Sequence, residues 1–220
     1  MPTLEVVELG LQPYQKVLDL QRTLFAAIKE GQAGNILILC SHPPVITIGK
    51  SGKASRIKVE SSVLSEKGVD VFEVERGGDA TYHGPGQIVG YPLLDLNPLR
   101  RDVGWYVRTL EEVLIATLAD HNVAGARVSG KPGVWVQGNA EARKICSIGV
   151  KLSRWCTMHG FSLNVLNSQD GFGLIDPCGM PDVRTTSIEE ESGVAIPLPE
   201  VTLAITRHFL ELFAFDREER

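Results

Sequence analysis

The sequence predicts one α+β domain in which helices pack against a mixed or mostly antiparallel sheet. Of its 220 residues, 43% are hydrophobic and 22% are charged, an ordinary globular composition for a chain that can bury one sizeable core. Short apolar runs of strand length are interspersed with three stretches of helical period. Because no internal repeat or low-complexity linker is visible, we expect a single domain over residues 1–220.

The expected strands are short apolar or alternating runs, several of them bounded by proline or glycine. Pro43 and Pro44, for example, stop regular structure between two apolar runs. In chain order, strands are expected at residues 5–9, 35–40, 45–48, 69–75, 88–96, 133–136, 143–152 and 157–165. The polar stretch 50–58 contains a glycine and is expected to be a loop.

The expected helices carry apolar residues at the helical period. The first covers residues 14–29, and the second runs from the cap residue Asp102 to His121. A third begins at Pro199, which suits a first helical turn. The apolar positions assigned to these helices are Leu18, Leu20, Leu24 and Ala27; Val103, Tyr106, Val107, Leu110, Val113, Leu114 and Leu118; and Val201, Ile205, Phe209, Leu212 and Phe213.

The net charge and the N-terminus limit the classes of partner. A net charge of -5 and a pI near 5.6 argue against nucleic acid, because phosphate binding normally requires a basic surface. Glu5 and Glu8 lie where a signal peptide needs positive charge and an apolar stretch. No window approaches the roughly 20 apolar residues that span a bilayer. We therefore expect a soluble cytoplasmic protein with neither a nucleic-acid nor a membrane partner.

The four cysteines have neither the spacing of a zinc site nor the density of a disulfide framework, so a working thiol is one interpretation. Cys178 lies between a proline and a glycine in the long loop 170–186, which suits an exposed thiol surrounded by backbone N–H groups. The alternative is a buried thiol that packs like a small apolar side chain. Cys40 and Cys156 lie in or near apolar strands, so we expect both to be buried.

Lys144 is the candidate for generating a thiolate, because an unperturbed cysteine has a pKa of about 8.5 and is mostly protonated at neutral pH. Strand alternation predicts that Lys144, Cys146 and Ile148 share one face. Partial desolvation there would lower the pKa of the amine and fit it for proton transfer. The alternative is an edge-strand lysine that reaches solvent. Cys146 is a weaker candidate nucleophile, since no adjacent glycine would help to form an oxyanion site.

The segment 76–87 is rich in glycine but matches neither a dinucleotide-binding loop nor a Walker phosphate loop. His83, together with Arg76 and Tyr82, is a candidate to line an acyl or pantetheine channel or to move protons. Two further histidines at similar strand ends are His42 and His159. Titratable side chains in several glycine-rich joints predict a single cleft.

A set of short stretches runs in order over most of the chain. They are His42-Pro43-Pro44-Val45, Arg76-Gly77-Gly78, Thr81-Tyr82-His83-Gly84-Pro85-Gly86-Gln87, Gly90-Tyr91-Pro92, Gly133-Val134-Trp135-Val136, Lys144-Ile145, Ile148-Gly149-Val150, His159-Gly160-Phe161, Leu163-Asn164-Val165 and Pro177-Cys178-Gly179. Together they resemble the lipoyl(octanoyl) transferases, the octanoyl-acyl-carrier-protein:protein N-octanoyltransferases of protein lipoylation. The ordered set is far more specific than any single motif.

The resemblance implies the fold of the biotin and lipoate protein ligases and a catalytic dyad of Cys178 and Lys144. It assigns acyl binding to Arg76, Gly77, Gly78, Asp79, Ala80, Thr81, Tyr82, His83, Ser147, Ile148, Gly149, Gly160, Phe161 and Ser162. It implies neither a metal nor ATP. Cys146 is a departure from the family pattern, because a small residue such as alanine is expected there.

The activity that the resemblance implies is transfer of an octanoyl or lipoyl group through a thioester on Cys178. The thiolate attacks the thioester on the phosphopantetheine arm of acyl carrier protein, and backbone N–H groups near Gly179 and at Gly77 or Gly78 hold the oxyanion. Lys144 then removes a proton from the acceptor lysine. The implied acceptors are lipoyl domains of 2-oxoacid dehydrogenase complexes and the glycine cleavage H protein.

An acidic donor predicts basic docking residues on the enzyme. Because acyl carrier proteins are acidic, this acidic chain is expected to concentrate lysine and arginine around its cleft. The candidates are Arg56, Lys58, Arg100, Arg101 and Arg143.

The sequence leaves three alternative functions open. An ATP-dependent lipoate or biotin ligase would share the fold, although no phosphate loop of the usual kinds is visible. An amidotransferase that moves lipoyl groups between proteins would take an acylated protein as its donor. A catalytically silent acyl-binding protein is the third, and the pairing of Lys144 with Cys178 argues against it.

Overall fold

The computed structural model describes residues 2–138, 141–166, 169–176 and 183–218. Helices and strands are interspersed along the chain, which confirms the predicted α+β class. The elements are β1 (Thr3–Leu11), α1 (Tyr14–Lys29), β2 (Asn35–Ser41), β3 (Val45–Ile48), η1 (Ala54–Arg56), α2 (Ser61–Glu66), β4 (Asp70–Glu73), β5 (Ala80–His83), β6 (Gln87–Leu93), α3 (Val103–Asp120), β7 (Gly125–Val128), β8 (Lys131–Val136), β9 (Arg143–Ser153), β10 (Cys156–Asn164), η2 (Gln169–Leu174), α4 (Ile188–Ser192), α5 (Leu198–Phe213) and β11 (Asp216–Arg217).

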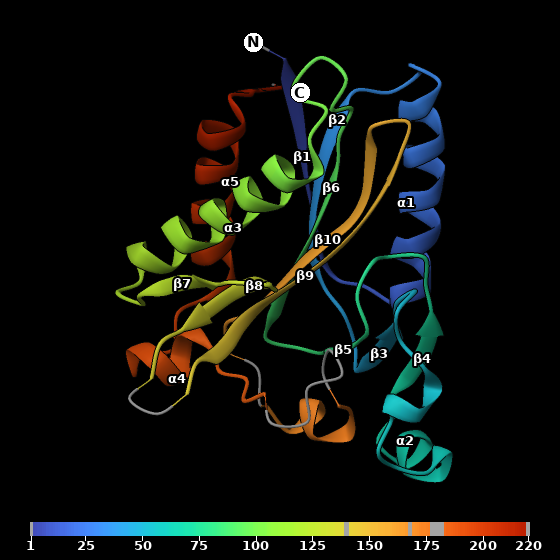
Figure 1. Ribbon diagram of the computed structural model, residues 1–220, viewed down its shortest axis with the longest axis vertical. Helices are drawn as coiled ribbons and strands as arrows, with labels where there is room; N and C mark the ends of the chain where they lie inside the picture. The colour runs from blue at the N-terminus through green and yellow to red at the C-terminus, as the bar shows by residue number, and fades with distance from the viewer. Residues whose placement is uncertain (1, 139–140, 167–168, 177–182, 219–220) are drawn as a thin grey trace.

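A large mixed sheet forms the centre of the molecule, and a small sheet lies toward one end (Figure 1). The strand order of the large sheet is β11-β1-β2-β6-β10-β9-β8-β7, and that of the small sheet is β4-β3-β5. β1 pairs parallel with β2 and β11, and β3 pairs parallel with β4. The remaining neighbours are antiparallel, so the sheet type agrees with the prediction.

Helices cover both faces of the large sheet (Figure 1). On one face, α1 buries Val17, Leu18 and Phe25 in a cluster with apolar residues of β2, β6 and β10. On the other face, α3 and α5 form the larger core, in which the rings of Phe209 and Phe213 stack at 4.5 Å. Burial of these apolar faces drives folding. Within the described ranges, none of the helices combines the length and the apolar character that crossing a bilayer requires.

The long elements agree with the sequence pattern, and the differences concern short elements and edges. α1 spans the predicted residues 14–29, and Asp102 caps α3 by accepting a hydrogen bond from the backbone N–H of Trp105 at 2.9 Å. The short elements α2, β5, β7 and α4 were not predicted, because four to six residues show no clear period. Three residues assigned to apolar helix faces are exposed: Leu20, Val103 and Leu212. They lie beside the rows of side chains that face the sheet.

Candidate functional site

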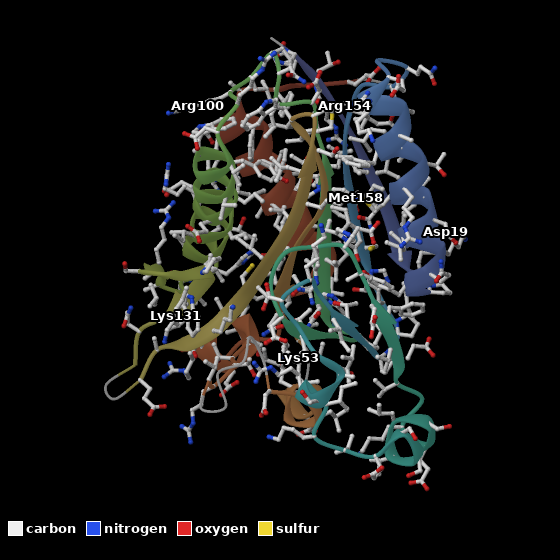
Figure 2. The ribbon with its side chains drawn as sticks, turned by 45° about the vertical axis from the view of Figure 1, so that its right-hand side comes forward. Asp19, Lys53, Arg100, Lys131, Arg154 and Met158 are labelled. Carbon is white, nitrogen blue, oxygen red and sulfur yellow. The ribbon has the colours of Figure 1, made fainter. Side chains whose placement is uncertain are left out.

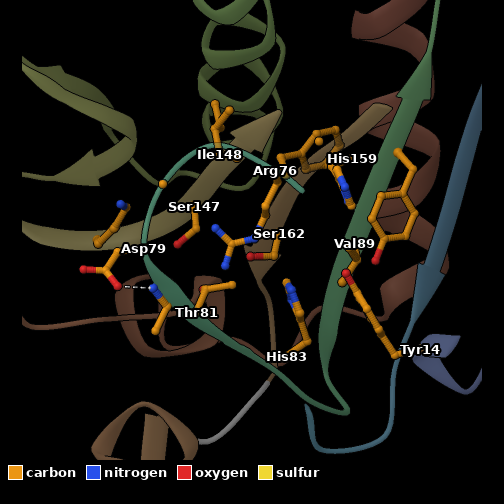
Figure 3. A pocket seen from close by; sticks show the side chains of 17 residues that line it. Tyr14, Arg76, Asp79, Thr81, His83, Val89, Ser147, Ile148, His159 and Ser162 are labelled. Carbon is orange, nitrogen blue, oxygen red and sulfur yellow. Dashed lines mark hydrogen bonds between the residues drawn. The ribbon is translucent and has the colours of Figure 1, made fainter. Parts of the chain in front are cut away.

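A pocket lies where β9 and β10 meet the glycine-rich segment before β5 and the N-terminus of α1 (Figure 3). Its lining residues are Tyr14, Arg76, Gly78, Asp79, Ala80, Thr81, His83, Val89, Tyr91, Lys144, Ser147, Ile148, Gly149, His159, Gly160, Phe161 and Ser162. The fold therefore brings Lys144 together with most of the residues that the resemblance assigns to acyl binding, although they come from three separate parts of the chain.

A β-bulge at Ile145 sets the direction of the Lys144 side chain. β8 pairs Trp135 with Lys144 and the preceding residue, Val134, with Cys146. Ile145 is therefore an extra residue on β9, which shifts the alternation of side chains by one. As a result, the side chain of Lys144 points into the pocket, whereas the side chain of Cys146 points to the opposite side of β9.

Cys146 lies on the core side of β9. Its side chain is buried in the apolar cluster under α3 and α5, and this burial raises the pKa of its thiol well above the usual range. The prediction that Cys146 shares a face with Lys144 is wrong, because the bulge interrupts the regular alternation. A buried thiol of raised pKa outside the pocket is a poor rival nucleophile. Cys40 and Cys156 are buried, as predicted.

Lys144 is 5% exposed, and its surroundings fix the amine in place. Nζ lies 5.1 Å from the ring centroid of Trp135, so the aromatic face replaces part of the lost hydration. Gly133 makes room for the aliphatic part of the side chain, because a Cβ there would lie 3.0 Å from Lys144 Cε and would collide with the carbonyl oxygen of Cys146. Its φ of +112° also favours glycine.

Gly133→Ala is therefore expected to lower both stability and activity. The added Cβ forces a shift of the strand as well as a strained backbone, and we expect a loss of about 3–5 kcal/mol in the free energy of unfolding. Gly130→Ala is the matched control, because Gly130 has a φ of +74° but no atom within 4 Å of the new Cβ. That variant should lose only about 1–2 kcal/mol. Equal losses in urea unfolding would contradict the role of Gly133.

The described residues on both sides of Cys178 are anchored near the pocket. The backbone N–H of Asp176 donates to the carbonyl oxygen of the last residue of η1 at 2.8 Å. Beyond the undescribed residues, Arg184 and Thr186 pair with Lys144. The carbonyl oxygen of Arg184 accepts a hydrogen bond from the N–H of Lys144 at 2.8 Å, and the N–H of Thr186 donates to Lys144 O at 3.0 Å. Cys178 itself lies outside the described residues, so its role stays a prediction.

Arg76 ties the glycine-rich segment to the small sheet. Its Nη2 atom donates to the carbonyl and hydroxyl oxygens of Thr47 at 2.7 and 3.0 Å, and Nη1 donates to Gly77 O at 3.0 Å. The backbone N–H of Gly77 donates to Val150 O on β9 at 2.8 Å. Because this N–H already donates a hydrogen bond within the protein, the structure argues against Gly77 as a donor to an oxyanion. Gly77 also lies outside the lining of the pocket.

Tyr82 is the second residue assigned to acyl binding that lies outside the lining, because its ring packs on Phe172 with 5.8 Å between centroids. Sequence reasoning also missed lining residues from the helix and the central strand: Tyr14, Val89 and Tyr91. Their local patterns show only a helix start and a buried strand. They reach the pocket because α1 and β6 pack beside β10, a contact that no local pattern reveals.

Two histidines of the pocket are neutral. Burial, with nearby His42 and Arg76, lowers the pKa of His83 to about 3, and burial lowers the pKa of His159 to about 4. Nδ1 of His83 donates to Gln87 Oε1 at 3.3 Å. With such pKa values these rings are poor proton carriers at neutral pH. Across the described residues, no three His, Cys, Asp or Glu side chains are grouped to hold a metal ion.

The neutral histidines predict a loss of stability in mild acid. The unfolded chain, with histidine pKa values near 6.5, binds protons that the folded chain does not bind until about pH 4. The free energy of unfolding should therefore fall as the pH drops below about 6.5, by up to about 1.4 kcal/mol per pH unit for each histidine. Urea unfolding at pH 7 and pH 5 measures this slope, and His83→Gln should reduce it. Equal stability at both pH values would refute the assignment.

The five basic residues proposed for docking do not all lie around the pocket. Several are ion-paired: Arg56 with Asp79 at 2.9 Å, Lys58 with Asp176 at 3.8 Å, and Arg143 with Glu191 at 2.7 Å. Figure 2 places Arg100 at the end of the molecule opposite Lys53. Inclusion of Arg100 and Arg101 was wrong, because β6 carries the chain away from the pocket before residue 100.

The fold and the pocket define a protein of the lipoate-ligase fold. The family model of the lipoyl protein ligase A/B catalytic domain matches residues 13–210, and the chain belongs to this family. Two of the relatives named octanoyltransferase are matched over most of their length. The one from Cytophaga hutchinsonii is 42% identical over 94% of this chain and 91% of its own length. The one from Solibacter usitatus is 44% identical over 95% of this chain and 92% of its own length. One from Myxococcus xanthus is 42% identical over 99% of this chain, which spans 61% of that relative. The predicted acyltransferase class is thereby confirmed.

Solved structures share the fold at low sequence identity. A bipartite lipoate protein ligase from Thermoplasma acidophilum matches with a TM-score of 0.77 at 17% identity, covering 100% of this chain and 86% of that chain. A biotin protein ligase from Aquifex aeolicus matches with a TM-score of 0.51 at 12% identity, covering 96% of this chain and 69% of that chain. The implied relationship to the biotin and lipoate ligase fold is therefore confirmed.

Proposed function

We propose that this chain carries an octanoyl group from acyl carrier protein to a lysine of a lipoyl domain, in two steps through a thioester on Cys178. The observation that carries the proposal is the buried amine of Lys144, which enters a pocket walled by residues that the resemblance assigns to acyl binding. The octanoyltransferase relatives support the choice of acyl group. Lipoyl domains of 2-oxoacid dehydrogenase complexes and the glycine cleavage H protein are the proposed acceptors.

The first step forms the acyl-enzyme. The Cys178 thiol gives its proton to the Lys144 amine, and the thiolate adds to the carbonyl carbon of the octanoyl thioester. The carbon–sulfur bond to the pantetheine then breaks, and the leaving thiolate takes the proton from Lys144. Because the donor thioester already supplies the activated acyl group, neither a nucleotide nor a metal takes part.

The second step passes the acyl group to the acceptor lysine. Most of that amine is protonated at neutral pH, so it must lose a proton before it can attack. Lys144, again neutral after the first step, removes a proton from the attacking amine. The Cys178 thiolate leaves and is protonated by Lys144. The acceptor nitrogen loses its second proton to solvent as the octanoyl group ends in an amide bond on the lipoyl domain.

A comparison of three donors tests this function against its rivals. We expect a lipoyl domain to gain one octanoyl group from octanoyl-acyl carrier protein, measured by intact mass. Free octanoate with ATP and Mg²⁺ should give no gain, and an octanoylated lipoyl protein should be a poor donor. Acylation that requires ATP would point to a ligase instead, and efficient transfer between lipoyl proteins would point to an amidotransferase. No gain with any donor would leave only an acyl-binding role.

Positive charge near η1 should affect the rate at which the acidic carrier protein binds. Lys53 is exposed on the loop before η1, whose Arg56 pairs with the lining residue Asp79. We expect Lys53→Glu to lower kcat/KM for octanoyl-acyl carrier protein about 3–10-fold, with less effect in high salt, because steering charges act on the association rate. The control is Arg101→Glu, which changes an exposed charge next to Arg100, the residue that Figure 2 shows at the other end of the molecule; this variant should keep a nearly normal kcat/KM. An equal or larger effect at Arg101 would contradict this docking side.

A further inference from the structure

A buried carboxylate lies between α3 and β8. It belongs to Glu111 of α3, the helix that packs on β7 and β8 (Figure 1), and the residue is 6% exposed. Burial of a charged group is unfavourable unless the group is paired and hydrogen-bonded. Both oxygens of Glu111 have partners: Oε2 accepts from Nε of Arg127 at 3.0 Å, and Oε1 accepts from the backbone N–H of Gly133 at 3.1 Å.

Gly133 lies where β8 departs from regular pairing with its neighbours. Against β7 the register shifts between Trp135 and Lys131, and against β9 it shifts between Val134 and Trp135. Gly133 lies within the first irregular stretch and directly before the second, and its φ is +112°. The hydrogen bond from its N–H to Glu111 therefore fixes the backbone of β8 at a point where strand pairing is irregular.

Two residues of β8 contact the side chain of Lys144. A Cβ built on Gly133 would lie 3.0 Å from Lys144 Cε, and Nζ of Lys144 lies 5.1 Å from the ring centroid of Trp135. The position of the amine in the pocket therefore depends on the backbone of β8 around Gly133. This dependence is significant for catalysis, because a misplacement of about 1 Å at a reacting group can lower a rate about 10²-fold.

We propose that Glu111 is a positioning residue of the transfer reaction: its hydrogen bond fixes Gly133, and β8 in turn fixes the amine of Lys144. The proposal rests on the proposed function, because it assumes that this amine moves protons during transfer. Glu111 lies outside the lining of the pocket, so its effect falls on kcat and passes through Lys144. The role requires an acceptor oxygen within reach of the Gly133 N–H, and it does not require a negative charge.

Two substitutions of Glu111 separate the reach of the side chain from its charge. Glu111→Gln retains an acceptor oxygen at the same reach, and Arg127 retains its second partner, Glu112, at 2.5 Å, so kcat for octanoyl transfer should stay within about twofold of the wild-type value. Glu111→Asp retains the charge on a side chain one methylene shorter. Its oxygen does not reach Gly133, so kcat should fall at least about tenfold with KM nearly unchanged.

Glu112→Ala is the matched control for the loss of a carboxylate. Glu112 is the next residue of α3, pairs with the same Arg127 and is exposed. This variant should therefore keep a normal kcat. If Glu111→Asp does not fold, Glu111→Met takes its place, because methionine fills the same space without an acceptor oxygen and should show the same loss of kcat.

A double-mutant cycle with Lys144→Ala distinguishes positioning from general damage to the fold. If Glu111 acts through the amine, Glu111→Asp should lower the residual kcat of Lys144→Ala less than about twofold, because the group that it positions is already absent. General distortion would instead cause the same loss in both backgrounds. Equal losses in the two backgrounds, or equal kcat values for the Gln and Asp variants, would overturn the proposal.

The same measurements separate this failure from failure of the function. If the wild-type protein transfers octanoyl groups and Lys144→Ala does not, equal kcat values for the two Glu111 variants show that only the role of Glu111 is wrong. If the wild-type protein accepts no carrier-bound acyl group, or if Lys144→Ala transfers normally, the proposed function itself is wrong.

Discussion

Lys144→Ala is expected to lower kcat/KM for octanoyl transfer by about 10³-fold or more. The substitution removes the buried amine that the bulge at Ile145 turns into the pocket, and with it the group proposed to move a proton in both steps. General acid–base catalysis contributes typically about 10²–10⁴-fold, and both half-reactions depend on it here. Steady-state transfer from octanoyl-acyl carrier protein to a lipoyl domain measures the loss.

Two further variants separate proton transfer from charge and packing. Lys131→Ala is the matched control, because the amines of Lys131 and Lys144 contact the same ring of Trp135 at 5.6 and 5.1 Å, and Lys131 is exposed. It should keep near-normal activity. Lys144→Arg places a permanent positive charge at this position but cannot accept a proton near neutral pH, so it should be nearly as inactive as the alanine variant. Full activity of Lys144→Arg would show that only charge is needed.

Cys178→Ser is expected to lower turnover by about 10³-fold or more, and Cys178→Ala to abolish it. A serine hydroxyl at neutral pH supplies far less of the ionised nucleophile than a thiol does. The fold should be unaffected, which thermal unfolding can establish. Transfer in the presence of excess octanoyl-acyl carrier protein measures the effect.

Cys146→Ala provides the control for the nucleophile. Its thiol is buried in the core cluster away from the pocket, so the variant should lose stability modestly while keeping most of its activity. Full turnover by Cys178→Ala, combined with loss of activity in Cys146→Ala, would reverse the assignment of the nucleophile.

The fold class and the long elements could be predicted from the sequence because they depend on repeating patterns. The helix over residues 14–29 and the cap at Asp102 each follow from a local signal that the structure retains. Ordered motifs also identified most of the pocket lining. These signals lie in contiguous segments, so a reader of the sequence can find them without knowing the topology.

Other features depend on tertiary contacts or on the backbone and leave no local signal. The bulge at Ile145 exists because β8 pairs with β9 out of strict register, and the sequence of β9 alone predicts the opposite side for Lys144. Tyr14 joins the pocket only because α1 packs on β10. His159 reads as an ordinary strand-end residue, and the sequence around it reveals neither its left-handed φ nor its hydrogen bond to Gln21.

The most direct test of the account is the mass of the protein after mixing with octanoyl-acyl carrier protein in the absence of an acceptor. We predict a gain of one octanoyl group that is sensitive to hydroxylamine, maps by peptide analysis to Cys178, and disappears on addition of a lipoyl domain. A stable gain on Lys144, a gain on Cys146, or no gain from a carrier that supports full transfer would contradict the thioester mechanism.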